Sequence, residues 1–133
     1  MHIPGLSQHR MDNPLHKKSF AFAVRAVRLS QFLKKEQSEH VMSKQLLRSG
    51  TAVGALYREA QHAESKADFL HKLAIAQKEC NEAMYWLELL HATEYLTQAQ
   101  FKSMHDDARE LIKLLTSILK TTKSKKQKSI INN

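Results

Sequence analysis

The sequence predicts an all-α protein, an antiparallel up-down-up-down four-helix bundle. Its 133 residues have the length of one ordinary domain. Only three Gly and two Pro occur, with both Pro in the first fourteen residues, whereas an all-β protein needs turn residues about every 8–12 positions. Four apolar stripes of helical period fill the rest of the chain, and connections of about one to four residues force neighbouring helices to run antiparallel.

The first predicted helix covers residues 15–36 and has two apolar stripes. The first stripe is Leu15, Phe22, Ala26, Leu29 and Leu33, and the second is Phe20, Val24 and Val27. Because the two stripes point to nearly opposite sides, we expect this helix to be covered on both.

The second predicted helix, residues 38–64, has a narrower stripe made mostly of small residues: Leu46, Val53, Leu56, Ala60 and Ala63. Gly50 and Gly54 lie on one face of this helix. Each Gly costs about 1 kcal/mol relative to Ala inside a helix, so we expect the pair to let a neighbouring backbone come close.

Two helices with clear start signals complete the bundle. The third begins at Ser65, with Asp68 at the third position after it, and ends within residues 92–95. The fourth begins at Thr97, where Gln100 completes a capping box, and fades at residues 121–123. Their stripes are Phe69, Leu73, Ala76, Cys80, Ala83, Leu87 and Leu90 in the third helix, and Phe101, Met104, Ala108, Leu111, Leu115 and Ile118, flanked by Ile112 and Leu119, in the fourth.

These elements divide the chain into a flexible N-terminal segment (1–14), the bundle (15–122) and a basic, disordered C-terminal tail (123–133). The first residues lack the apolar region of a signal peptide and no stretch of 18 apolar residues follows, so we expect a cytoplasmic protein with no membrane partner. Cys80 is the single cysteine, which excludes an intramolecular disulfide and a cysteine-based zinc site.

Positive charge is concentrated at the two ends of the chain. The formal net charge of +8 divides into +4 for residues 1–40, −1 for residues 41–96 and +5 for residues 97–133. The densest block has four cations and no acid: Lys123, Lys125, Lys126 and Lys128. Such a block is either a solvated terminus or a contact for nucleic acid or an acidic partner.

The sequence offers one motif typical of metal enzymes. Two Glu-x-x-His sequences, at residues 59–62 and 88–91, have the spacing of di-iron ligand pairs. Counted from the turn near residue 65, their heights differ by about 17 residues, or about 25 Å, which is too far for a shared metal pair. We therefore interpret them as surface pairs and Cys80 as a buried small hydrophobe, and we predict no catalytic residue, metal or cofactor.

Two surfaces remain once the core is assigned. The first has more apolar area than a monomeric bundle needs and indicates a subunit interface, with deep packing between neighbouring helices as the alternative; it consists of Phe20, Val24, Val27, Tyr85, Trp86 and Leu89. The second is basic and lies on the first and last helices, which are neighbours in such a bundle. It consists of Arg25, Arg28, Lys34, Lys35, Lys113, Lys120 and the tail lysines.

Residues 45–60 (QLLRSGTAVGALYREA), 65–69 (SKADF) and 79–90 (ECNEAMYWLELL) resemble the bacterial four helix bundle protein family. This family includes proteins encoded in intervening sequences of large-subunit ribosomal RNA genes and, more distantly, the accessory variability determinant of diversity-generating retroelements. The resemblance covers residues 17–120. Leu56 departs from it, since the family commonly has Asn at this position, and no role of that Asn is transferred.

The resemblance implies a ring-like homopentamer without catalytic residues. In the retroelement relative, the positive surface of the pentamer is taken to engage nucleic acid and a reverse transcriptase. Arg48 and Arg58 match the family's basic pair by position, and salt bridges to Glu59 or Glu64 are the structural alternative to RNA contacts by these arginines.

The leading hypothesis is a non-enzymatic, oligomeric bundle that binds RNA or DNA through backbone phosphates, with a reverse transcriptase as a further partner. Such binding should be indifferent to sequence and sensitive to salt. One alternative is a protein-interaction adaptor whose positive face docks an acidic partner. Another is a metal-dependent enzyme that uses the Glu-x-x-His pairs.

Overall fold

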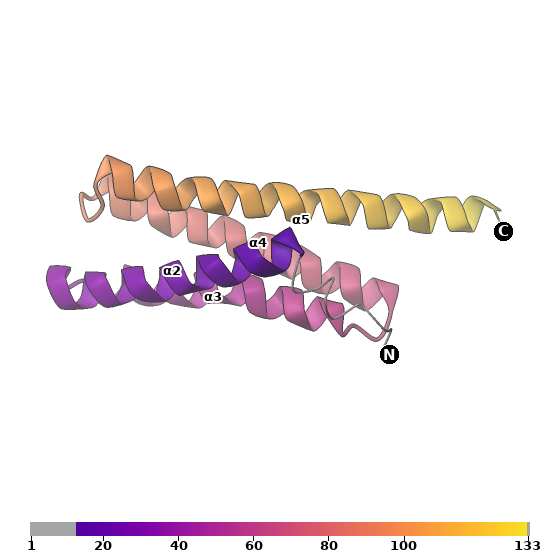
Figure 1. Ribbon diagram of the computed structural model, residues 1–133, viewed down its shortest axis with the longest axis horizontal. Coiled ribbons are helices and arrows are strands. Elements are labelled where there is room, and N and C mark those ends of the chain that lie inside the picture. The colour runs from indigo at the N-terminus through magenta and orange to yellow at the C-terminus, as the bar shows by residue number, and fades with distance from the viewer. Residues whose placement is uncertain (1–12, 133) are drawn as a thin grey trace.

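The computed structural model describes residues 13–132, and the side chains of residues 13–124. Four helices run antiparallel in chain order: α2 (Pro14–Gln37), α3 (Met42–Gln61), α4 (Lys66–Ala92) and α5 (Gln98–Asn132). Each helix packs on the next, and α5 returns to contact α2 (Figure 1). The predicted all-α, up-down four-helix bundle is confirmed.

The first helix starts and stops on local signals. The Asn13 side chain accepts a hydrogen bond from the Leu15 N–H (2.8 Å) and Pro14 occupies the first turn, where its missing N–H costs nothing. The helix ends at Ser38, whose φ of 51° is left-handed. The predicted range of residues 15–36 is therefore correct to within one residue at each end.

Glu39 explains why α3 begins at Met42 and not near residue 38 as predicted. Its buried carboxylate accepts hydrogen bonds from the backbone N–H groups of Val41 (3.0 Å), Met42 (3.0 Å) and Ser43 (2.7 Å). Burial raises the pKa of Glu39, but the hydrogen bonds from Met42, Ser43 and Val41 together outweigh burial and hold this pKa below its ordinary value. An acceptor of this strength replaces the Ser or Thr cap of an ordinary helix start.

The two glycines of α3 lie against α2. A Cβ built on Gly50 would stand 2.7 Å from the Ala26 Cβ, and one on Gly54 would stand 3.3 Å from the Ser19 carbonyl oxygen. The first distance is shorter than van der Waals contact allows. The predicted close approach of two backbones at this glycine pair is confirmed.

The start signals of α4 and α5 are also confirmed. The Ser65 hydroxyl accepts from the Asp68 N–H (3.0 Å), and Thr97 and Gln100 exchange both bonds of a capping box (2.9 and 3.2 Å).

The predicted end of the last helix at residues 121–123 is wrong, since α5 continues to Asn132. No Pro or Gly follows residue 122, so nothing in the sequence stops the helix there. The division at residues 14 and 122, and disorder of the tail, stay predictions, and residues 1–12 lie outside the described part.

The core follows the predicted stripes with small differences. Its buried members include Leu15, Phe22, Ala26, Leu33, Leu46, Val53, Ala60, Leu73, Ala76, Cys80, Ala83, Leu87, Leu90, Met104, Ala108, Leu111, Leu115 and Leu119. Tyr57 is buried although it was not predicted, whereas Leu29, Leu56, Phe69 and Ile118 are only partly buried. The expectation that α2 is covered on both sides is wrong for a single chain, because its second stripe faces outward at Phe20 and Val27.

Candidate nucleic-acid interface

Arg25 is paired at the contact between α2 and α5 and is not a free cation, although its side chain is 38% exposed. Its guanidinium contacts Asp107 Oδ2 at 2.5 Å, Ser103 Oγ at 2.9 Å and the Ser103 carbonyl oxygen at 3.3 Å. These contacts join α2 to α5 and neutralise the charge. Arg25, which was predicted to bind phosphate, therefore stabilises the packing of α2 on α5.

Arg48 is likewise paired, but with partners that the sequence did not indicate. It bridges α3 to α4 through Glu79 (3.2 Å) and Glu82. The salt bridges to Glu59 or Glu64 that we considered do not form at Arg48, because those acids lie more than one helical turn further along the chain, and Glu59 instead pairs with Lys72 (3.8 Å). Two carboxylates at one guanidinium leave little positive charge for a phosphate.

Arg58 stacks over an exposed aromatic ring. Its guanidinium carbon lies 5.4 Å from the centroid of Phe20, a cation–π contact between α3 and α2. Arg58 makes this contact in place of the salt bridges to Glu59 or Glu64 that were the structural alternative for it. Both side chains line a shallow groove together with Ser19, Ala23, Thr51, Gly54 and Ala55.

The second half of α5 has cations but no acid. All three acids of this helix lie before residue 111 and are paired: Asp106 with Lys102 (2.8 Å), Asp107 with Arg25, and Glu110 with Lys18. The hydrogen bond from Lys102 holds the pKa of Asp106 below its ordinary value. From residue 111 to the end of the sequence there is no Asp or Glu.

Lys113, Lys120 and Lys123 are exposed on this acid-free half, and none forms an ion pair within the described residues. Arg109, which was not among the predicted site residues, joins them: at 3.6 residues per turn the four side chains fall within a sector of about 80° and extend over about 21 Å. A helical wheel of residues 98–124 would have identified Arg109. We call Arg109, Lys113, Lys120 and Lys123 the α5 ridge.

The remaining predicted cations do not all join the α5 ridge. Pairing of Lys18 with Glu110 and of Arg25 with Asp107 sets an antiparallel register, so Lys34 and Lys35 lie at the opposite end of the α2–α5 contact from Lys113. There they occupy the last turn of α2, where cations favour the helix dipole. The expectation that the bundle gathers both groups on one surface is therefore corrected. The side chains of Lys125, Lys126 and Lys128 lie outside the described residues, although their backbone continues α5.

The predicted interface residues form two patches on different helices. Phe20 (56% exposed) and Val27 (37%) protrude from α2 with the half-buried Val24, while Tyr85 (54%) protrudes from α4 beside Trp86 and Leu89. The Tyr85 and Trp86 rings meet edge to face with centroids 5.0 Å apart. Within the described residues α2 and α4 share no contact, since they stand diagonally in the bundle. The two patches thus lie on helices that do not contact each other.

Cys80 and the Glu-x-x-His residues that could suggest catalysis are engaged in contacts within the bundle. Cys80 is fully buried, its thiol donates to the Ala108 carbonyl oxygen (3.3 Å), and burial raises its pKa to about 12. Glu88 pairs with His105 (3.1 Å), and His91 stacks on Phe101 with centroids 4.4 Å apart. Over the described residues, no three His, Cys, Asp or Glu side chains are grouped as a metal site, and no helix is long and apolar enough to cross a membrane.

Comparisons with known proteins agree on the family and the fold. The sequence model of the 23S rRNA-intervening sequence protein family matches residues 11–117. The structure resembles the crystal structure of a protein of unknown function from the S23 ribosomal protein family of Bacteroides thetaiotaomicron VPI-5482, with a TM-score of 0.79 and 57% sequence identity over 80% of this chain and 98% of that chain. No curated protein matches the chain significantly.

Proposed function

We propose, since the chain belongs to the 23S rRNA-intervening sequence protein family, that this four-helix bundle is a non-enzymatic nucleic-acid-binding protein that works as a homo-oligomer. The observation that carries the proposal is the acid-free second half of α5 with its exposed ridge. Every acid of α5 is already paired, so the ridge lysines keep their charge for an external anion.

The α5 ridge has the chemistry of a phosphate-backbone contact. Lysines on one face of a helix are mobile point charges, and each phosphate that they neutralise releases counterions. The ridge offers no aromatic ring or amide that would read a base edge, so this contact is indifferent to sequence. Binding through four cations should weaken with salt at a log–log slope of about −3 to −4.

Fluorescence anisotropy with a labelled RNA oligonucleotide and the full chain tests this function. The variant Lys113→Glu, Lys120→Glu, Lys123→Glu should lose more than about tenfold in affinity at low salt and flatten the salt slope. A matched control reverses three exposed lysines on α3 and α4, Lys44→Glu, Lys66→Glu, Lys78→Glu, with the same change in net charge, and should bind nearly as well as the wild type. Equal losses of affinity in both variants, or RNA binding retained by the ridge variant, would overturn the ridge as the RNA contact. The alternative would then be that the ridge binds an acidic protein partner.

The positions of the two apolar patches support the oligomer. Patches on the separate helices α2 and α4 give each copy two apolar surfaces that a partner can cover. Pairing the α2 patch of one copy with the α4 patch of the next is a head-to-tail contact, which forms a ring where the rotation between copies closes and an open filament where it does not. The homopentamer implied by the family resemblance is one such ring.

The proposal also includes a cellular location and a protein partner. A cytoplasmic location and a reverse transcriptase as protein partner are consistent with the basic, single-cysteine chain and with the resemblance stated above. Co-purification of a tagged full chain with a co-expressed reverse transcriptase, compared with the ridge variant and the matched control, tests the partner. Recovery of the enzyme that survives nuclease treatment would support a direct contact, and loss of the enzyme on nuclease treatment would contradict it.

A further inference from the structure

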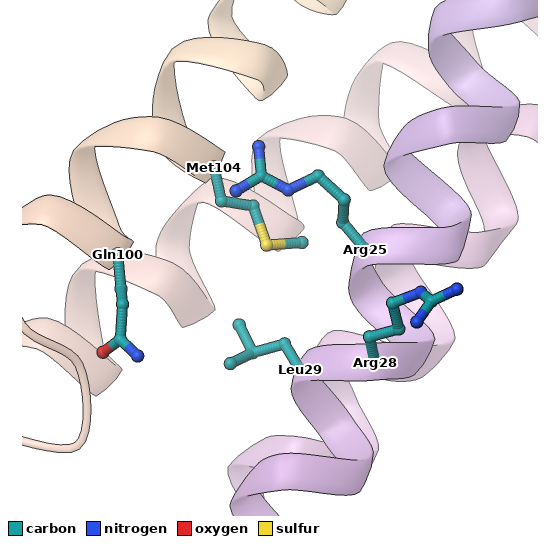
Figure 2. Close-up of a pocket in the computed structure, with 5 residues that line it drawn as sticks. All are labelled: Arg25, Arg28, Leu29, Gln100 and Met104. Atoms are coloured by element: carbon teal, nitrogen blue, oxygen red, sulfur yellow. The ribbon is translucent and has the colours of Figure 1, made fainter.

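The helix pair α2–α5 leaves a groove open near the start of α5. These two helices share the smallest interface of the bundle. The groove has a volume of about 190 Å³ and is lined by Arg25, Arg28, Leu29, Gln100 and Met104. In Figure 2, Leu29 of α2 and Met104 of α5 point toward one another across the opening and Arg25 reaches toward α5, whereas the Arg28 guanidinium points away from the opening at its outer edge.

The walls of the groove combine an apolar floor with hydrogen-bond donors. Met104 is buried and Leu29 is half-buried, and together they form the apolar floor of the groove. Arg28 is exposed and forms no ion pair within the part of the chain that the structure describes. The Gln100 oxygen accepts from the Thr97 N–H (2.9 Å), so its amide NH₂ is left as a donor.

Arg25 has a different role from Arg28 in this groove. Asp107 and Ser103 fix its guanidinium plane and cancel its charge. A fixed, neutralised guanidinium is a stacking surface for a planar ring. The Asp107 carboxylate beside it repels an acidic side chain, so the groove suits a neutral planar group better than a carboxylate.

The volume of the groove indicates the size of its ligand. Pockets that enclose a whole small molecule measure about 300–1,000 Å³, and this groove is smaller. It therefore suits one planar group of a longer chain whose remaining contacts lie elsewhere. Gln100 and Lys113 are separated by about 20 Å along α5 and by about 140° around it, so a single strand of about 4–16 nucleotides must pass around α5 to contact both the groove and the ridge.

We propose that the α2–α5 groove holds one unstacked nucleotide of a single-stranded nucleic acid, with its base on Leu29, Met104 and the Arg25 plane and its phosphate on Arg28. This inference rests on the proposed function and adds a preference for single strands. A duplex keeps its bases stacked and paired, so it can use the α5 ridge but not the groove. The preference requires no sequence readout, because every base has a planar face.

Three labelled probes of equal length separate the groove from the ridge: a 12-nucleotide oligouridylate, an abasic 12-mer with the same phosphates, and a 12-base-pair RNA duplex. The wild type should bind the oligouridylate about tenfold more tightly than the abasic strand, since base stacking on a protein contributes roughly 1–3 kcal/mol. The variant Arg28→Ala, Leu29→Ser should lose this ratio while its duplex affinity changes by less than about twofold. Leu29→Ala alone is a milder change to the half-buried side chain under the base and keeps the test valid if the double variant unfolds.

The control Lys44→Ala removes one exposed cation of α3 and should preserve the oligouridylate-to-abasic ratio. A ratio that is unchanged in the groove variants, or a wild type that does not distinguish the abasic strand, would overturn the nucleotide pocket while leaving phosphate binding by the ridge intact. A wild type that binds none of the three probes would overturn the proposed function itself. A single-stranded DNA probe run in parallel shows whether the groove uses the ribose 2′-hydroxyl.

Discussion

Gly50 in α3 faces Ala26 in α2 so closely that a Cβ on the glycine would lie 2.7 Å from the Ala26 Cβ. Gly50→Ala gains about 1 kcal/mol of helix propensity but forces the two backbones apart, and overpacking of a core costs about 1–3 kcal/mol. We expect a net loss of about 1–2 kcal/mol in the free energy of unfolding, measured by urea denaturation.

A compensating variant isolates this contact. Adding Ala26→Gly to Gly50→Ala moves the methyl group from α2 to α3, so the double variant should be no less stable than Ala26→Gly alone. The two changes should thus be non-additive by 1 kcal/mol or more, as expected of residues in contact (about 0.5–3 kcal/mol). Additive losses would show that the helices adjust to the extra methyl group.

Glu39→Gln should weaken the start of α3 in a pH-dependent way. The native pKa of Glu39 lies below its ordinary value, so its carboxylate adds stability above the unfolded-state pKa of about 4.3 and loses it as the pH falls through the native pKa. At pH 7 the variant should lose about 1–2 kcal/mol, and the difference from the wild type should shrink below about pH 4. Exposed Glu36→Gln is the control, and a difference from the wild type that does not shrink as the pH is lowered from 7 to 3 would contradict the capping role.

The sequence predicted what periodicity and caps determine and missed what tertiary pairing determines. The helix stripes and the Ser65 and Thr97 caps are local signals, so they could be located without a structure. The partners of Arg25 and Arg48 depend on helix register, which brings Asp107, Glu79 and Glu82 beside them from 31 to 82 positions away. From the sequence alone these two arginines therefore resembled cations that are free to bind phosphate. In the fold, the acids that the helix register places beside them neutralise their charge.

Arg48→Ala should change stability and leave RNA affinity unchanged. Its guanidinium joins α3 to α4 through Glu79 and Glu82, and because the pair is half exposed we expect a loss of only about 0.5–1 kcal/mol. RNA anisotropy should match the wild type within about twofold, in contrast to the α5 ridge variant. A loss of RNA affinity clearly greater than twofold would return Arg48 to the binding surface.

The Cys80 thiol should be unreactive in the folded protein. With a pKa raised to about 12 by burial, about one thiol in ten thousand is ionised at pH 8, and the thiolate is the reactive form. A chromogenic disulfide reagent should label Cys80 in 6 M guanidinium chloride within minutes and fail to label the native protein over the same period. Rapid native labelling would show that the thiol is accessible and reopen its use as a nucleophile.

The two apolar patches predict a specific pattern of subunit mixing. Phe20→Glu on α2 and Tyr85→Glu on α4 each place a charge in an exposed apolar patch, so each variant alone should dissociate, as measured by size-exclusion chromatography with light scattering. Val41→Glu, at an exposed valine outside both patches, should leave the oligomer intact.

If the α2 patch of one copy contacts the α4 patch of the next, the Phe20→Glu chain still has an unaltered α4 patch and the Tyr85→Glu chain an unaltered α2 patch. Mixing the two variants should therefore yield heterodimers and no larger ring. If each patch instead contacted its own copy across a two-fold axis, mixing would yield no heterodimer, so this one experiment distinguishes a head-to-tail ring from a symmetric dimer.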